Sequence, residues 1–215
     1  MADDIRAINV EWPGPAGLLE GLVNAKAGSA PRAIAVLAHP LSTAGGTMHT
    51  KAVFHAAKAL ARIDCAVLRF NFRGVGRSGG TFADGPGEQQ DFIAALDFMA
   101  ARYPGTARVW AGGMSFGAWV AMTAAAQDPR VTALIGIAPP VTRRDFSPVV
   151  AAAKPTFLIH GEMDELIPLK EVRKFYGQLA EPKELVMIDA ADHLFDGRVA
   201  EVGEAIEDLL QDFDG

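Results

Sequence analysis

The chain has 215 residues, half of them apolar and 21% charged, which suits one globular domain spanning residues 1–215. Its formal charge of −6 argues against a nucleic-acid partner, because affinity for a polyanion rests on clustered Lys and Arg. No apolar run approaches the length needed to span a membrane, and the one cysteine, Cys65, has no internal disulfide partner. We therefore expect a cytoplasmic protein that binds neither nucleic acid nor membrane.

The elements follow a regular order along the chain. Two strands, at 5–10 and 18–24, flank a Pro- and Gly-rich turn and predict an antiparallel hairpin. From residue 33 onward, buried-strand patterns alternate with helical periodicity, which predicts a mostly parallel sheet covered by helices on both faces. The expected strands are 33–38, 66–72, 107–111, 131–138, 155–160 and 184–188; the expected helices are 48–62, 88–101, 118–127, 169–179 and 194–213, the last broken near Gly197.

One short motif lies between a predicted strand and a predicted helix. Gly113-x-Ser115-x-Gly117 has the context of a nucleophile elbow, in which a strained turn lifts the serine clear of the sheet. The glycines have no Cβ, so neighbouring backbone can approach closely. The N–H of Phe116 begins the following helix, where unsatisfied donors favour negative charge. The motif predicts a nucleophilic serine beside half of an oxyanion hole, although so short a pattern also fits ordinary α/β architecture.

Polar side chains at three strand ends strengthen this interpretation. Ligands of open parallel sheets bind at the carboxyl ends of the strands. Ser115 follows the strand at 107–111, Asp164 follows that at 155–160, and His193 follows that at 184–188. The order Ser, Asp, His is the one expected of a nucleophile-elbow hydrolase.

The histidine is better determined than the acid. Of the five histidines, His193 alone follows the last candidate acid at a strand end, whereas His160 closes a strand and is interpreted as structural. Asp164 is favoured as the acid because a Ser-His-Asp arrangement needs a carboxylate on the loop facing the histidine. Its neighbours Glu162 and Glu165, and Asp145 after the preceding strand, remain alternatives.

A second glycine motif, at residues 74–79, matches the G-x-G-x-x-G pattern of dinucleotide sites. That mechanism requires a helix to open within the glycines, so that its N-terminus meets the pyrophosphate. Here residues 81–87 intervene before any helix, and the nearest candidate acid, Asp91, lies inside that helix. The pattern therefore does not predict a nucleotide cofactor.

Taken together, these segments resemble the α/β-hydrolase superfamily over nearly the whole chain. In particular, the chain resembles small bacterial lidless predicted hydrolases related to dienelactone-hydrolase-like esterases. The matching segments are His39 to Met48, Arg69 to Ser78, Gly113 to Gly117, and His160 to Glu165 with Pro168. The resemblance implies a three-layer α/β/α fold with a mostly parallel eight-stranded sheet.

The same resemblance implies roles for individual residues. Ser115 would be the nucleophile, His193 the base and Asp164 the residue that orients the base, with the backbone N–H groups of Leu41 and Phe116 as the oxyanion hole. Many relatives have His-Gly where this chain has His39-Pro40. The expected enzyme is a serine hydrolase of carboxylesterase type, acting on small ester or thioester substrates without a cofactor or metal, as a monomer or homodimer.

The walls of the pocket are less defined by the sequence. Only sixteen residues, 139–154, separate two strands at the place where relatives insert a cap, so we expect no cap domain and an open cleft at Ser115. Amide or other bonds on the same triad, and a non-catalytic binding protein that keeps the fold, remain alternatives. The candidate pocket residues are Met114, Val141, Phe146, Met163 and Phe195, each of which also suits the core.

Overall fold

A computed structural model, which describes residues 5–28 and 30–214, contains one sheet of eight strands. The strands run in the order β1-β2-β4-β3-β5-β6-β7-β8. The hairpin β1–β2 joins the sheet antiparallel through β4, and all the later neighbours pair in parallel, as the alternating pattern predicts. The strands are β1 (Ile5–Gly14), β2 (Gly17–Lys26), β3 (Ala33–Ala38), β4 (Cys65–Phe70), β5 (Val109–Met114), β6 (Ala133–Ile137), β7 (Thr156–Gly161) and β8 (Lys183–Ile188).

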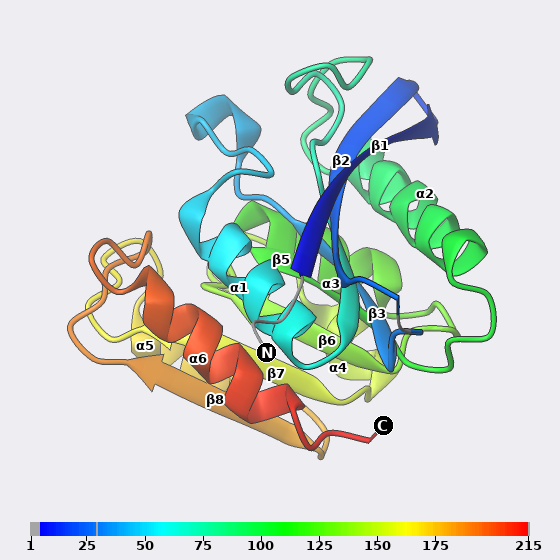
Figure 1. The fold of residues 1–215 in the computed structure, drawn as a ribbon. Helices are drawn as coiled ribbons and strands as arrows, with labels where there is room; N and C mark the ends of the chain where they lie inside the picture. The colour runs from blue at the N-terminus through cyan, green and yellow to red at the C-terminus, as the bar shows by residue number, and fades with distance from the viewer. Residues whose placement is uncertain (1–4, 29, 215) are drawn as a thin grey trace.

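Helices cover both faces of this sheet (Figure 1). On one face α1 and α6 lie side by side, and a core cluster that includes Leu60 and Ile206 packs beneath them. The other face is covered by the remaining helices over a second cluster, which includes Phe92 and Val172. The helices are α1 (Lys51–Arg62), α2 (Pro86–Arg102), α3 (Phe116–Ala125), α4 (Ser147–Ala152), α5 (Leu169–Tyr176) and α6 (Val199–Leu210), with a 3₁₀ turn, η1 (Ser42–Ala44).

The register of the central strands sets the position of the loops. The strands β3 to β7 are buried along their whole length, as their continuous apolar sequences predict. Ala38 at the end of β3 pairs with Gly113, and Met114 at the end of β5 pairs with Ile137 at the end of β6. These strands therefore end at the same edge of the sheet, and the loops that follow them meet there.

Two expectations differ from the structure near the C-terminus. The last helix begins at Val199 instead of residue 194, because the chain turns through positive φ at Phe195 and Gly197 before it can become helical. The preceding helix, α5, ends at Tyr176, three residues early. Between β6 and β7 the described chain contains a single short helix, α4, so the fold lacks a cap domain as expected. None of the helices described is both long and apolar enough to cross a membrane.

Candidate active site

Ser115 lies in the turn between β5 and α3. Its φ of 51° and ψ of −120° place a non-glycine residue at positive φ, which is the strained backbone expected of the elbow. Its N–H donates to the carbonyl of Ile137 at 2.8 Å, which ties the turn to the end of β6. The side chain remains partly exposed at the edge of the sheet. The strain is thus held by strand pairing on one side and by the start of α3 on the other.

The two glycines of the motif are required by close backbone packing. A Cβ at Gly117 would lie 2.3 Å from the carbonyl oxygen of His39 and 2.6 Å from that of Ala38. A Cβ at Gly113 would lie 2.6 Å from the Gly117 carbonyl carbon and 2.7 Å from the Ala38 oxygen. Real Cβ atoms do not approach other atoms this closely, so only glycine lets α3 begin directly against the loop after β3.

Three side chains from three loops form a hydrogen-bonded relay. His193 Nδ1 lies 2.7 Å from Asp164 Oδ2, and a carboxylate only accepts, so Nδ1 carries the proton. In the neutral ring Nε2 is then an acceptor, and it lies 2.9 Å from Ser115 Oγ, which donates to it. The structure therefore brings together Ser115, His193 and Asp164 in the tautomer that proton removal from the serine requires.

Asp164 is the buried end of this relay. Its side chain is 0% exposed, whereas that of His193 is 12% exposed. Burial raises the pKa of Asp164, but the hydrogen bonds from His193 and from the N–H of Ile167 outweigh this and leave the pKa below its usual value. The N–H groups of Leu166 and Ile167 both donate to Oδ1, at 2.8 and 2.9 Å. The carboxylate is therefore ionised and fixed in direction at neutral pH.

A second histidine lies against the same carboxylate. His160, fully buried at the end of β7, donates from Nε2 to the carbonyl of Ile167 at 2.8 Å, and the same nitrogen lies 3.6 Å from Asp164 Oδ2. Burial lowers the pKa of His160, so its ring is neutral. The turn at 164–167 is thus held from both sides. The sequence suggested a structural role for His160, and its position four residues before Asp164 was the signal for this contact.

The alternative acids lie elsewhere. Asp145 is exposed, and its carboxylate accepts from the N–H and hydroxyl of Ser147, both at 2.8 Å. Glu162 and Glu165 are exposed, and the Glu162 carboxylate accepts from the N–H of Ala190. Of the four candidates, only Asp164 is hydrogen-bonded to His193.

The loop after β3 faces the start of α3. His39 is fully buried; its Nδ1 donates to the carbonyl of Pro40 at 2.6 Å, and its Nε2 accepts from the N–H of Phe72 at 3.2 Å. Burial lowers the pKa of His39 to about 4, although the hydrogen bond to Pro40 opposes the shift. A neutral histidine thus joins the loops after β3 and β4, a contact that no feature of the sequence beyond the His-Pro pair indicates.

Leu41 and Phe116 are the two residues whose backbone N–H groups were expected to form an oxyanion hole. The Leu41 carbonyl accepts from the N–H groups of Ala44 and Gly46, which closes the η1 turn. Phe116 is the first residue of α3, where the N–H has no partner within the helix. In the part of the chain that the structure describes, neither N–H has a hydrogen-bond partner.

The glycine-rich segment at 74–79 is structural in this fold. Arg73 forms a bidentate ion pair with Asp91, with Nε–Oδ2 and Nη2–Oδ1 distances of 2.9 and 2.7 Å, and its N–H also donates to Oδ2. Asp91 lies inside α2, as predicted, and its side chain is fully buried. Arg77 pairs with Glu11 and Glu20 on the hairpin. The loop is therefore anchored by protein carboxylates, and no helix opens within the glycines.

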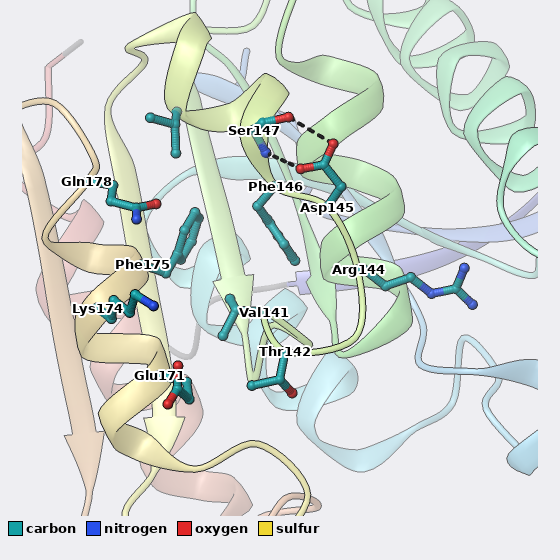
Figure 2. A pocket seen from close by; sticks show the side chains of 11 residues that line it. Val141, Thr142, Arg144, Asp145, Phe146, Ser147, Glu171, Lys174, Phe175 and Gln178 are labelled. Atoms are coloured by element: carbon teal, nitrogen blue, oxygen red, sulfur yellow. Dashed lines mark hydrogen bonds between the residues drawn. The ribbon is translucent and has the colours of Figure 1, made fainter.

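Two of the five candidate pocket residues line a cavity between α4 and α5. This cavity of about 290 Å³ has Val141 and Phe146 on one wall (Figure 2). The ring of Phe146 meets that of Phe175 from α5, with centroids 5.0 Å apart. In Figure 2 the side chain of Arg144 points away from these rings, and it stacks on Trp119 at 4.6 Å while pairing with Asp84.

The other three candidate pocket residues lie in two different places. Met163 is 62% exposed and lines a separate hollow that also includes His193. Met114 and Phe195 are fully buried in the core cluster under α1 and α6, so the prediction that they line the pocket is wrong. Both are apolar residues within two positions of a site residue in the chain, but their side chains are buried in the core. The described residues contain no group of His, Cys, Asp and Glu arranged to hold a metal ion.

This fold and relay define the class of the protein as an α/β serine hydrolase. The family described as serine aminopeptidase, S33, matches residues 29–154, and the chain belongs to this family. A curated relative, described as an uncharacterized protein of Rickettsia prowazekii, is 36% identical over 94% of this chain and 87% of its own length.

Solved structures agree with this assignment. An α/β serine hydrolase homologue from Coxiella burnetii superposes with a TM-score of 0.88 at 34% identity, over 94% of this chain and 97% of its own. A serine hydrolase without a lid from Xanthomonas campestris superposes with a TM-score of 0.86 at 36% identity, over 94% and 93% of the two chains. This chain is thus similar to both hydrolases, and the Xanthomonas campestris protein also has no cap.

Proposed function

We propose that this protein hydrolyses carboxylic esters, thioesters among them, of small or short-acyl substrates through an acyl-enzyme intermediate. The observation that carries the proposal is the relay from Ser115 Oγ through His193 to Asp164, with contacts of 2.9 and 2.7 Å. A scaffold protein has no physical need for a serine at strained positive φ beside a histidine of the correct tautomer. Neighbouring esterase structures at lower identity share the fold.

The proposed reaction has two halves. Ser115 Oγ attacks the ester carbonyl while its proton passes to His193 Nε2, and the carbonyl oxygen becomes an oxyanion held by the N–H groups of Phe116 and Leu41. The C–O bond to the alcohol breaks as His193 returns the proton to the leaving oxygen. Water, deprotonated by His193, then attacks the acyl-enzyme and releases the acid and free Ser115. Asp164 stays ionised and orients His193 throughout.

The substrate pocket is proposed from three residues. Val141 and Phe146 line the cavity beside α4, and Met163 lines the hollow at His193. Without a cap, little protein surface surrounds a small substrate, so we expect weak, broad activity and no activation at a lipid–water interface. We also keep the expectation of a cytoplasmic monomer or homodimer.

A covalent probe tests the proposal directly. A fluorophosphonate should label the folded protein at Ser115, with the site identified by peptide mass spectrometry. The variant Ser115→Ala should lose labelling and roughly 10⁴-fold or more of its turnover of p-nitrophenyl acetate, since the triad members act as a unit. The control Thr106→Ala removes a hydroxyl before β5, at the opposite end of that strand from Ser115, and should retain both. Absence of labelling in folded protein would contradict the proposal and favour a binding protein.

Amide hydrolysis is the second candidate, because the family description names an aminopeptidase. The same triad cleaves amides when the site protonates the poorer leaving group well. Comparison of p-nitroanilide and p-nitrophenyl derivatives that share one acyl group separates the two activities. A kcat/KM for the anilide within about tenfold of that for the ester would favour the amide.

A further inference from the structure

Solvent-exposed apolar side chains cluster around His193. Met163, Leu166 and Leu194 are 62%, 50% and 54% exposed, and they line a hollow of about 480 Å³ together with His193. They come from two loops, one after β7 and one after β8. Large apolar side chains that cluster on the surface around one concave site mark a place where something apolar binds.

The hollow is preformed, because backbone hydrogen bonds tie its two loops together. The Met163 N–H donates to the carbonyl of Ala191 at 2.9 Å, and the Glu162 N–H donates to that of Ile188 at 3.0 Å. Within the second loop, Asp192 Oδ1 accepts from the N–H groups of Leu194 and Asp196, both at 3.0 Å. The exposed side chains therefore project from a fixed frame.

The relay determines which part of an ester meets this hollow. His193 Nε2 takes the proton from Ser115 and must later deliver it to the departing oxygen, so that oxygen lies within hydrogen-bond reach of His193. The carbonyl oxygen is held instead at Phe116 and Leu41, on the side of α3 and the loop after β3. The group attached to the departing oxygen is consequently directed over the residues that surround His193.

Resting on the proposed esterase function, we infer that this hollow is the leaving-group subsite and that its occupant is an uncharged, apolar alcohol. The charge of the rim supports the choice. Glu165 and Asp192 are exposed carboxylates on the rim, and no lysine or arginine is among the described residues that line it. An anionic leaving group, such as the phosphate-bearing thiol of a coenzyme-A ester, would be repelled there.

Two ester series test the inference. In the first, acetates of straight-chain alcohols from methyl to hexyl vary only the leaving group; in the second, methyl esters from acetate to hexanoate vary only the acyl group. In the native enzyme kcat/KM should rise about twofold for each methylene of the alcohol, since a fully buried methylene gives at most about fourfold. In the double variant Met163→Gln, Leu166→Gln this slope should flatten, while the slope of the acyl series is kept.

Matched controls separate the possible outcomes. Ile8→Gln places the same polar group at an exposed apolar position on the distant hairpin and should keep both slopes. A flat alcohol series in native enzyme that still hydrolyses esters would overturn the inference and leave the proposed function intact. Loss of all ester turnover would instead refute the proposed function. A change in sedimentation coefficient in the double variant would also overturn the inference, because it would make the hollow an interface between copies.

Discussion

The two sides of Ser115 are built in opposite ways. On the side of α3 and the loop after β3, backbone atoms pack so closely that Gly113 and Gly117 leave no room for a Cβ, and the buried His39 joins two loops. On the side of His193, exposed apolar side chains surround an open hollow. The closed side fixes the donors proposed to hold the oxyanion, which every ester shares, and the open side meets the part of the substrate that varies.

On the open side, one buried carboxylate, that of Asp164, holds His193 in position. Asp164 is hydrogen-bonded to His193, and its fully buried side chain is held by two backbone N–H groups and flanked by His160. Pre-organised charge is worth most where water is excluded. Selectivity and catalysis can therefore be changed separately on this side, because the exposed residues and the anchor are different residues.

Removal of the anchor should have the largest effect. Asp164→Asn replaces the acceptor of His193 Nδ1–H and should lower kcat for p-nitrophenyl acetate by roughly 10³- to 10⁴-fold, because the tautomer is no longer fixed. The same exchange at the alternative acid, Asp145→Asn, should leave kcat within about twofold. Steady-state kinetics with circular dichroism as a folding check would decide the matter. An Asp164→Asn variant with more than a tenth of native activity would show that another acid orients the base.

A single added methyl group at Gly117 should disrupt the close backbone packing between α3 and the loop after β3. In Gly117→Ala the new Cβ meets two backbone oxygens, those of His39 and Ala38, neither of which can rotate away. We expect a loss of roughly 1–3 kcal/mol in the free energy of unfolding and a fall of about 10- to 100-fold in kcat/KM as the oxyanion loop is displaced.

The control for this change is Gly177→Ala. Gly177 has ordinary right-handed φ, and its Cβ would lie 3.4 Å from the nearest atom, so stability should change by less than about 0.5 kcal/mol. Urea denaturation measures both variants. Equal stability of the two would mean that the packing around α3 is looser than the structure indicates.

The smallest effect at neutral pH concerns His39. Its pKa is about 4 in the folded protein and about 6.5 when unfolded, so the unfolded chain binds the proton first as pH falls. The stability that neutral His39 contributes is complete above pH 6.5 and declines toward pH 4, by roughly 3 kcal/mol from this residue alone.

A pH series of urea denaturations tests this sign. The native protein should lose stability more steeply between pH 6.5 and 4 than His39→Gln, which cannot take up the proton. His49→Gln is the control, because His49 is exposed in the loop before α1 and its replacement should leave the pH slope nearly native. Parallel curves for native protein and His39→Gln would show that His39 does not carry the pH dependence.

The sequence by itself determined the class of fold and the order of the functional residues. Alternating apolar periodicities predicted the parallel sheet, because local propensity and burial patterns are properties of short segments. The Gly113-x-Ser115-x-Gly117 turn was predictable for the same reason, since its conformation follows from residue type. Asp164 and His193 could be placed only at strand ends, because the order of residues along the chain does not show which side chains come into contact.

Tertiary structure decided which side chains meet. Four acids follow the relevant strands, and only the folding of the 164–167 turn against His160 directs Asp164 toward His193. Packing also decides whether an apolar side chain is buried or exposed. Met114 and Phe195 are buried in the core, whereas Met163 is exposed to solvent. An apolar residue is equally suited to the core and to the lining of a binding site, and only the elements packed around it decide between these two positions.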